Sequence, residues 1–483
     1  MVSRRTFLHR TIKTGLAVGT GLLLSGCAQG AQTPTPTSSA PASVPPTAGA
    51  AKPAAPSGVP GAEVLRPGQP YKGTTINYIS LNYTYSQGLK TIIQGFQEAT
   101  GMTVNMELLG TLDNFQKQRL ELSVGSSKYD VYQVPPFNRA EYQKADWLAP
   151  LGALVGDENL TPKAWDMGDF FPVSLEQGMY EGKRLDLPIF SATIIFYYRK
   201  DVFESAGIQG PPATFDELLT VCDKLKKQGT DVSPIGLRGA PGIEANMWPF
   251  PILLYSYGGN FFKDFPKDMR PALTEPGSIK SVEVWTKLVT EYGFPAMVNA
   301  THEELIVAMQ QGKVAMVLDG HPLAGVFLDK EKSKAYGKTG VAPIPSGPAG
   351  RFPAFSEHGI AIAKNAKNKE AAWEFVKWAT SRDVLVEVAL QTPYVAATRR
   401  SAIENPKYQE KYNYADGEFL KVTKQMLEER KPTYVPPIPE WAEVGDVIGN
   451  AVSKATLGQV SAADAMKQAE AEVDRILKQA KYY

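Results

Sequence analysis

The chain has 483 residues, 43% of them hydrophobic, and its 51 basic and 50 acidic side chains leave a net charge of +1. This balance, without a basic cluster, argues against a nucleic-acid-binding protein and against sustained contact with an anionic membrane surface. The only cysteines are Cys27 and Cys222. Because Cys27 is assigned below to a lipid anchor, we expect no intrachain disulfide, and a hydrophobic core must stabilise the protein.

An export signal is predicted over residues 1–26. Arg4 and Arg5 precede an apolar run from Gly15 to Leu24, which ends at the small residues before Cys27. At about a dozen residues this run is too short to cross the roughly 30 Å hydrocarbon core of a membrane, so we do not interpret it as a transmembrane helix. The pattern resembles twin-arginine lipoprotein signals, in which the cysteine receives the lipid. We therefore expect export of a folded protein that is lipid-anchored outside the cytoplasm of a bacterium, at a cell surface or a periplasmic face.

The segment from Cys27 to Pro70 is predicted to be a disordered tether. It consists mainly of proline, alanine, threonine, serine and glycine, with no aromatic residue and only three charges, at Lys52, Glu63 and Arg66. Such a composition buries too little apolar surface to offset the entropy lost on ordering. The remaining chain, residues 71–483, is longer than one hydrophobic core usually serves, so two lobes are expected.

Strand-like and helix-like segments alternate after the tether. Extended runs are predicted at Thr75–Ile79, Val104–Leu108 and Asp130–Val134, and an apolar helical stripe separates the first two. This alternation favours an α/β fold, in which helices cover both faces of a mostly parallel sheet. Ligands of such sheets bind at the carboxyl ends of the strands, so the loops 81–85 and 135–138 are candidate ligand loops.

Two further extended runs, Arg184–Pro188 and Ile194–Tyr198, lie close together in the sequence. The residues that join them, Ile189–Thr193, are predicted to cross between the lobes. Helices are predicted after two caps. Thr214 forms a capping box with Glu217 and opens a helix whose apolar face includes Cys222, which we interpret as core packing. Ser461 is the predicted N-cap of an amphipathic helix at the C-terminal end.

Familiar catalytic motifs are incomplete. The segment His302–Ile306 begins like a zinc-protease helix but lacks the second histidine one turn later, and Tyr336–Thr339 lacks the leading glycine of a phosphate-binding loop. Neither a nucleophile elbow nor a cysteine–histidine metal spacing is present in the sequence. We therefore predict a protein that is not an enzyme and uses no cofactor or metal. One alternative stays open, because two carboxylates that meet only in space can hydrolyse a glycan.

Six stretches of the body follow a shared order and spacing. They are Gly182–Pro188, Phe196–Ile208, Pro211–Leu218, Gln311–Met316, Gly359–Ala363 and Glu370–Val376. In these stretches the chain resembles the family 1 extracellular solute-binding proteins of bacterial ABC importers, the maltose-binding-protein relatives, over nearly all of residues 71–483. The resemblance implies a two-lobed, periplasmic-binding-protein-like fold of type II. In that fold hinge strands join two α/β lobes, each a mostly parallel sheet flanked by helices, and a solute binds in the cleft between them.

The resemblance also implies how the chain divides. Residues 71–190 and 320–357 would form the N-terminal lobe, and residues 191–319 and 358–483 the C-terminal lobe. A solute that contacts both lobes would favour the closed state, which would then dock on the transmembrane permease of an ABC importer. We expect a monomer with no nucleic-acid partner. A solute sensor built on the same fold is an alternative that the sequence leaves open.

Many members of this family bind sugars, whose rings stack on aromatic side chains and whose hydroxyl groups bond to carboxylates and amides. Candidate ligand contacts are therefore taken from the loops at strand ends, the crossovers and the tryptophan-bearing segments. They are Asn82, Tyr83, Tyr85, Phe137, Asn138, Phe190, Ser191, Trp248, Asp319, His321, Glu357, His358 and Trp441.

One departure from the family bears on the ligand. Sugar-binding relatives carry a stacking tryptophan just after the position of Asp319 and Gly320, where this chain has His321 and Pro322. The candidate loops also lack clustered arginine or lysine, which disfavours a phosphorylated ligand. We therefore expect a small uncharged carbohydrate, with a polyol as an open alternative. In the glycan-active alternative, Asp319, Glu357 or Glu440 would serve as acid and base.

Overall fold

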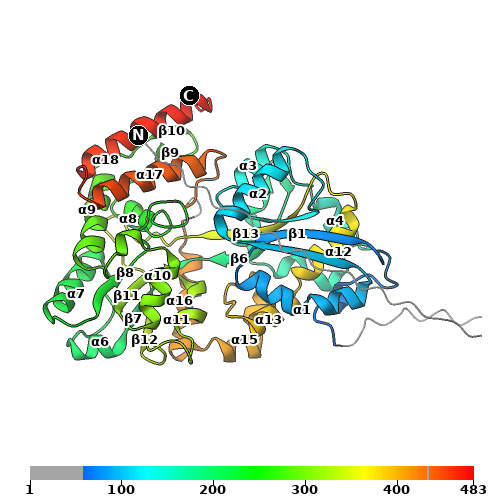
Figure 1. Cartoon of the computed structure of the whole chain (residues 1–483), viewed down its shortest axis with the longest axis horizontal. Coiled ribbons are helices and arrows are strands. Elements are labelled where there is room, and N and C mark those ends of the chain that lie inside the picture. Colours follow the sequence, from blue (N-terminus) through cyan, green and yellow to red (C-terminus); the bar gives the residue numbers. More distant parts are fainter. Residues whose placement is uncertain (1–57, 432–433) are drawn as a thin grey trace, which may run out of the picture. The chain divides into compact units, whose positions relative to one another are not determined.

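The computed structural model describes residues 58–431 and 434–483. These residues belong to one folding unit that contains two main sheets with helices packed around each (Figure 1). The predicted export signal and Cys27 lie outside the described residues, so both stay predictions.

The first sheet has five strands in the order β2-β1-β3-β13-β6. The strands are β2 (Thr103–Leu109), β1 (Thr75–Leu81), β3 (Val131–Val134), β13 (Ser356–Ile362) and β6 (Leu187–Ala192). β1 is parallel to both of its neighbours, whereas β13 runs antiparallel to β3 and β6. All four residues of β3 are buried, as expected for a central strand covered on both faces. The three strands predicted early in the body are thus confirmed within two residues at each end.

The second sheet has four strands in the order β12-β7-β11-β8. The strands are β12 (Thr339–Ala342), β7 (Ile194–Arg199), β11 (Val314–Gly320) and β8 (Ser233–Gly236). β7 runs antiparallel to both neighbours, whereas β11 is parallel to β8. Every residue of β11 is buried, which explains why this strand is a continuous apolar run in the sequence up to Asp319.

Each sheet contains one reversed strand, and the connectivity explains both. β6 ends at Ala192 and β7 begins at Ile194, so the chain leaves the first sheet at one edge and enters the second sheet at once. β12 and β13 make the second connection in the opposite direction. A strand that arrives directly from the other sheet starts at the connecting edge, whereas a strand that follows a helix ends there. The predicted crossover at residues 189–193 therefore corresponds to the end of β6 and the β6–β7 connection.

The predicted division into lobes requires correction. β12 pairs with β7 in the second sheet, so the first part of the segment 320–357 does not belong to the N-terminal lobe. β13 pairs with β3 and β6, so the chain after residue 356 returns to the N-terminal lobe and does not continue in the other one. The second crossing lies between β12 and β13. It is not at Gly320, because α11 (Ala324–Phe327), which follows β11, packs on α10 (His302–Gln310) of the same lobe.

A third crossing follows. α13 (Arg382–Gln391), α14 (Arg400–Ile403) and α15 (Pro406–Lys411) pack on one another, and α13 also packs on α1 (Thr84–Thr100) in the N-terminal lobe. α16 (Glu418–Glu428) then contacts β12 and β7 in the second sheet. The N-terminal lobe therefore takes most of residues 356–411, and the C-terminal lobe takes the chain from α16 onward.

The helices flank the two sheets. In the N-terminal lobe, α2 (Thr111–Ser123) and α3 (Arg139–Lys144) lie on one side of the strands, and α1 (Thr84–Thr100) and α13 lie on the other (Figure 1). This lobe also contains α4 (Gly152–Gly156), α5 (Pro172–Gln177), α12 (Lys369–Ala379) and the hairpin of β4 (Met179–Tyr180) and β5 (Lys183–Arg184). The other lobe contains α6 (Lys200–Ser205), α7 (Phe215–Lys227), α8 (Phe250–Ser256), α9 (Pro276–Glu291), α17 (Trp441–Thr456), α18 (Ala462–Gln479) and the hairpin of β9 (Phe262–Asp264) and β10 (Asp268–Pro271).

Two predicted helix caps are confirmed. The Thr214 hydroxyl accepts a hydrogen bond from the backbone N–H of Glu217 at the start of α7, and the Ser461 hydroxyl accepts one from the N–H of Asp464 at the start of α18. The Glu217 carboxylate accepts from the N–H of Ala213, one residue before the position that a capping box requires. Cys222 is fully buried in α7, and burial raises the pKa of its thiol, which agrees with the packing role predicted for it.

The last part of the predicted tether is folded. From Gly58 onward the chain packs on α12 and α13, where Val64 is buried and the Trp378 indole donates a 2.7 Å hydrogen bond to the carbonyl of Pro60. Gly61 has a φ of +73°, and a Cβ at this position would lie 2.5 Å from the Ser381 hydroxyl oxygen. This position therefore requires glycine. The composition of residues 58–70 did not reveal this packing because the surface that they cover lies more than 300 residues later in the chain.

Candidate functional site

A cavity of about 560 Å³ lies between residues of the two lobes. One wall is formed by α3, α5 and β4 of the N-terminal lobe. The facing wall is formed by residues of the β9–β10 hairpin, the 435–439 segment and Tyr482. Residues 355–357 lie between these walls, at the point where the chain enters β13. The cavity thus lies at the edge where both sheets exchange strands, which is where α/β folds bind ligands.

Glu357 lines this cavity and is held by two serines. The Ser191 hydroxyl donates a hydrogen bond to Glu357 Oε2, and Ser191 Oγ lies 2.7 Å from Ser174 Oγ. Within the described part of the chain, the other carboxyl oxygen, Oε1, is buried without a hydrogen-bond partner. Burial raises the pKa of Glu357 to about 8, although Ser191 and Arg139 act against this rise. The side chain is therefore largely a neutral carboxylic acid at pH 7.

Arg139 lies beside Glu357 and also lines the cavity. Its guanidinium donates to both carboxylate oxygens of the buried Asp186, at 3.1 and 3.3 Å. This bidentate ion pair neutralises both charges. The backbone of β13 approaches the pair closely, because a Cβ at Gly359 would lie 2.3 Å from Asp186 Oδ1. Arg139 Nη1 is buried and makes no hydrogen bond to any described residue, so it is a second donor group at the cavity.

His358 is oriented by a chain of buried amides. The Asn114 side-chain amide donates to Gln133 Oε1 at 3.2 Å, which leaves Gln133 Nε2 to donate to His358 Nδ1 at 2.6 Å. Since Nδ1 accepts, the ring proton is on Nε2. Burial, with a smaller effect of the Arg139 charge, lowers the pKa of His358 to about 3. His358 is therefore neutral at pH 7 and is a hydrogen-bond donor through Nε2.

Aromatic rings cover His358. The Tyr83 ring centroid lies 5.8 Å from that of His358, and the Phe190 centroid lies 5.3 Å from it in an edge-to-face arrangement. Tyr83 and Phe190 also contact each other, at 5.4 Å. The structure therefore brings together five predicted site residues from three strand ends, namely Tyr83, Phe190, Ser191, Glu357 and His358.

Two predicted residues meet at the edge of the second sheet. Asp319, fully buried at the end of β11, accepts hydrogen bonds from Arg238 Nε at 2.7 Å and Arg238 Nη2 at 2.6 Å. The Trp248 indole donates to the same carboxylate at 3.2 Å. This pair shares no hydrogen bond or ring contact with the Glu357 group among the described residues. The two groups lie on different sheets.

His321 lies at the hinge between the sheets. Its Nδ1 accepts a 3.2 Å hydrogen bond from the Thr193 N–H, and the His321 N–H donates to the Thr193 carbonyl at 2.8 Å. Burial lowers the pKa of His321 to about 4. These reciprocal bonds join the β6–β7 connection to the end of β11, so His321 holds the hinge and does not line the cavity.

The remaining predicted residues are dispersed. Tyr85 is fully buried and its hydroxyl donates to the Ala379 carbonyl, and Phe137 is buried in the core. Asn82 is exposed at the start of α1, where its Oδ1 accepts from Gln87, and Asn138 is the N-terminal residue before α3. Trp441 is buried against Phe261, with ring centroids 4.8 Å apart. For these five residues, ligand contact stays a prediction.

Several site residues were missed in the sequence. Arg139, Asp186 and Arg238 were not considered because a charged residue gives no sign in a sequence that it will be buried. Arg139 directly follows the predicted loop 135–138, and Arg238 follows β8 by two residues, so strand ends contained a usable signal for both. The wall residues Phe265 and Tyr482 come from a hairpin and the C-terminal end, where the strand-end rule gives no guidance.

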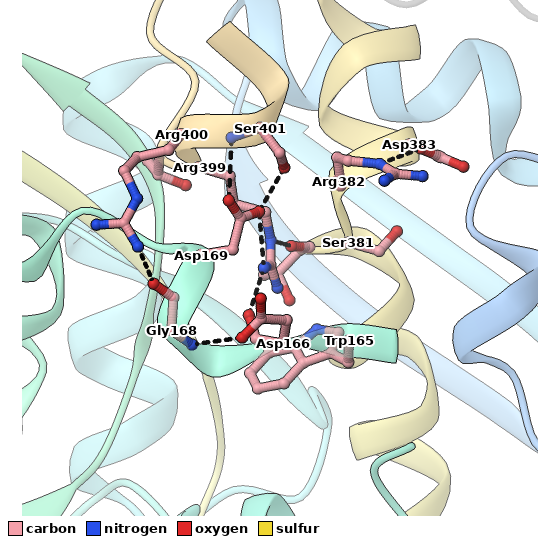
Figure 2. A network of polar contacts seen from close by, with 12 residues as sticks. Trp165, Asp166, Gly168, Asp169, Ser381, Arg382, Asp383, Arg399, Arg400 and Ser401 are labelled. Carbon is pink, nitrogen blue, oxygen red and sulfur yellow. Dashed lines mark hydrogen bonds and ion pairs between the residues drawn. The ribbon is translucent and has the colours of Figure 1, made fainter. Parts of the chain in front are cut away.

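The buried Arg399 holds in place the loop that precedes α5, which forms part of the cavity wall. Arg399 donates to the carbonyls of Thr380, at 2.6 Å, and Asp166, at 2.7 Å, and lies 3.8 Å from the centre of the Phe170 ring. Asp169 accepts from the N–H and hydroxyl of Ser401, as Figure 2 shows. Burial lowers the pKa of Arg399 to about 10. This network attaches the loop before α5 to the start of α14 and so positions α5, which carries Ser174.

No helix among the described residues is long and apolar enough to span a membrane. Likewise, residues 58–431 and 434–483 contain no group of three or more histidine, cysteine, aspartate or glutamate side chains arranged to hold a metal ion.

Comparison with known proteins agrees with this geometry. The model of the family described as bacterial extracellular solute-binding proteins matches residues 82–385. A mannitol-binding protein of Pseudomonas aeruginosa is 26% identical over 390 residues, which cover 77% of this chain and 86% of the relative.

Solved structures agree as well. An ABC transporter solute-binding protein of Agrobacterium radiobacter K84, in complex with ribitol, superposes with a TM-score of 0.76 at 25% identity, over 84% of this chain and 100% of that chain. A counterpart from Agrobacterium vitis S4 with bound D-mannitol has a TM-score of 0.74 at 25% identity, over 84% and 99% of the two chains. These matches confirm the predicted two-lobed α/β fold, and the match over residues 82–385 means that the chain belongs to the family of bacterial extracellular solute-binding proteins.

Proposed function

We propose that this protein is the extracytoplasmic receptor of an ABC importer and that it binds a small uncharged polyol or carbohydrate. The observation that carries the proposal is the charge state of the buried groups at the cavity. Arg139 is paired with Asp186, and Glu357 is largely protonated at pH 7. The hydrogen-bonding groups that stay available, Arg139 Nη1 and Glu357 Oε1, are buried without partners in the described residues.

Such a site matches a neutral ligand with several hydroxyl groups. A buried donor or acceptor without a partner is costly, and a ligand hydroxyl can serve as either. A charged ligand would find no unpaired buried counter-charge, because Arg139 and Asp186 already neutralise each other. The other charged residues at the cavity, Lys144, Glu176 and Glu181, are exposed to solvent. The names of the relatives agree with this class, since they bind mannitol and ribitol.

The absence of the stacking tryptophan after Gly320 favours a linear ligand over a ring. His321 occupies that position, and its hydrogen bond with Thr193 holds it at the hinge. The aromatic surface at the first sheet consists of Tyr83 and Phe190 packed edge-on around His358, and it offers no flat stacking platform. A linear polyol needs no such platform, because its hydroxyl groups carry most of the recognition.

The connections between the sheets support a closing motion. Only the β6–β7, β12–β13 and α15–α16 connections join the lobes within residues 58–431, so a few backbone angles can change their separation. A ligand that contacts both cavity walls would favour the closed state by its differential affinity. The lipid anchor at Cys27 would keep this receptor near the permease, and the protein would release its solute unchanged, without turnover.

Thermal melts with a panel of solutes test the proposal. D-mannitol, ribitol, maltose, glucose, an amino acid and a polyamine would each be added to the purified protein. A ligand at about one hundred times its dissociation constant stabilises a protein by about 2.7 kcal/mol, which raises its melting temperature by several degrees. We expect this shift with a polyol or a neutral sugar. A shift only with the charged solutes, or conversion of a sugar to product, would contradict the proposal.

A further inference from the structure

Glu357 is held in a geometry that distinguishes its two carboxyl oxygens. Oε2 accepts a hydrogen bond from the Ser191 hydroxyl, and Ser191 is itself within 2.7 Å of the Ser174 hydroxyl. Oε1 is buried, makes no hydrogen bond to any residue in 58–431 or 434–483, and belongs to a side chain that lines the cavity. Because Oε2 already acts as the acceptor, a proton on this carboxyl group belongs on Oε1, where it is directed away from the serines.

We propose that Glu357 acts as a neutral carboxylic acid that donates a hydrogen bond from Oε1 to a ligand hydroxyl oxygen, and that deprotonation of this group releases the ligand. The inference rests on the proposed function and goes beyond it by assigning a donor role and a pH dependence to one atom. A carboxylate in this place could only accept hydrogen bonds. A protonated acid supplies a donor without adding a charge to the cavity.

The charged and titratable groups around Glu357 agree with a neutral form. From α3, the Arg139 guanidinium faces it, but Asp186 neutralises that cation at 3.1 Å. From β13 itself, the neighbouring His358 is neutral because burial lowers the pKa of its ring, and Gln133 donates a hydrogen bond to its Nδ1. Tyr83 from the start of α1 and Tyr394 from the segment after α13 are also near, and burial raises the pKa of both phenols, so neither is charged.

Burial has a larger effect on the pKa of Glu357 than the hydrogen bonds and charges around it. Loss of water raises the pKa of its carboxyl group to about 8, because the hydrogen bond from Ser191 and the Arg139 charge compensate only part of the lost hydration. Ser191 and Ser174, which lower this pKa, also fix the orientation of the Glu357 side chain. The site therefore keeps the acid protonated at neutral pH and lets it ionise in mildly alkaline solution.

The test compares ligand affinity against pH in three proteins by isothermal titration calorimetry with D-mannitol and ribitol. In the unmodified protein, we expect a constant affinity from pH 6 to 7 and a decrease that approaches tenfold per pH unit above about pH 8. Glu357→Gln keeps an acceptor for Ser191 and a donor for the ligand, so it should bind within a few-fold of the unmodified protein and without this pH dependence. Glu357→Leu should bind at least tenfold more weakly at pH 7. Glu291→Gln, an exposed change in α9, is the control that should leave the profile unaltered.

A second measurement needs no ligand and separates this inference from the proposed function. Infrared difference spectra between pH 7 and pH 9.5 should show a carboxylic-acid carbonyl band that disappears at the higher pH and is missing in Glu357→Gln. If neither polyol binds but the band is present, the ligand class proposed above is wrong and the protonated acid stands. If the band is absent at pH 7, or if affinity is independent of pH while Glu357→Gln binds poorly, Glu357 acts as a carboxylate and the inference is overturned.

Discussion

The Trp248 indole N–H donates a 3.2 Å hydrogen bond to Asp319, the same carboxylate that accepts both guanidinium bonds from Arg238. Trp248 and Asp319 are 71 residues apart in the chain. Trp248 and Asp319 were predicted separately as ligand contacts. In the structure they form one buried, hydrogen-bonded group with Arg238 at the edge of the second sheet. This hydrogen-bonded group should contribute to the stability of the fold.

Replacing Asp319 by alanine should destabilise the fold. The substitution leaves the Arg238 cation in a largely buried site without its partner, and removal of one member of a buried ion pair costs about 3–5 kcal/mol. Trp248→Phe keeps the ring packing and removes one hydrogen bond, so its cost should be about 0.5–1.5 kcal/mol. Urea denaturation measures both. An Asp319→Ala protein as stable as Lys421→Ala, which breaks an exposed ion pair with Glu418, would show that the pair is not buried as described.

Features set by local sequence patterns could be predicted, whereas features set by contacts between distant residues could not. Strand ends and crossovers were predictable because apolar runs and turn residues are local, and the predicted crossovers supplied Ser191 and Glu357, which share one hydrogen bond. Local patterns do not show which side of a strand end faces the cavity, so Tyr85, whose hydroxyl bonds to Ala379 in the core, was selected from a loop at a strand end.

The predicted division of the chain into lobes was wrong for a related reason. β12 and β13 are short neighbouring strands that belong to different sheets, and only the pairing of β12 with β7 and of β13 with β3 reveals this. Such pairing is long-range and leaves no local mark. The ion pair of Arg139 with Asp186, 47 residues apart, was invisible for the same reason.

The Arg399 network should be essential for the N-terminal lobe. Arg399→Met removes hydrogen bonds to two backbone carbonyls and a cation–π contact with Phe170, for an expected loss of about 2–4 kcal/mol. Arg400→Ala, which removes an exposed arginine bonded to Gly168 in the same network, is the matched control and should change stability much less (Figure 2). Calorimetric melts check both. Equal losses in the two variants would contradict the role given to burial of Arg399.

The folded part of the predicted tether can be tested with two glycines. Gly61 and Gly68 both have a positive φ, of +73° and +79°, but a Cβ would collide with Ser381 only at Gly61. The left-handed conformation alone costs an alanine about 1–2 kcal/mol. Gly61→Ala should therefore lower the urea midpoint clearly more than Gly68→Ala. Identical midpoints would mean that the segment around Gly61 does not pack on α13.

The buried His321 should contribute acid sensitivity to the stability of the protein. The folded-state pKa of His321 is about 4, below the usual value near 6.5 that applies to the unfolded chain, so the unfolded state binds more protons between these values. The stability that His321 contributes is fully present above pH 6.5 and decreases as the pH falls toward 4, by up to about 1.4 kcal/mol per pH unit for this proton.

His321→Asn tests this expectation, because its side-chain oxygen can still accept from the Thr193 N–H that His321 Nδ1 now binds. Denaturant midpoints recorded from pH 4 to 7 should fall less steeply in the variant than in the unmodified protein. The remaining slope would combine His358, whose pKa is lowered to about 3, with Glu357 and Glu244, whose pKa values burial raises to about 8 and about 7 and which act in the opposite direction. A slope unchanged by the substitution would assign the acid sensitivity to other groups.

In the proposed function, the cavity between the lobes binds an uncharged, hydroxyl-rich solute. Isothermal titration calorimetry of the purified protein with D-mannitol, ribitol, maltose and gluconate at pH 7 measures this binding. We predict saturable binding of one molecule of a neutral polyol or sugar, recovered unchanged afterwards, and at least tenfold weaker binding of the anionic gluconate. Binding of gluconate in preference to every neutral solute would contradict the proposal, because Asp186 already neutralises Arg139, the buried cation of the cavity, and Lys144 on the cavity wall is exposed to solvent.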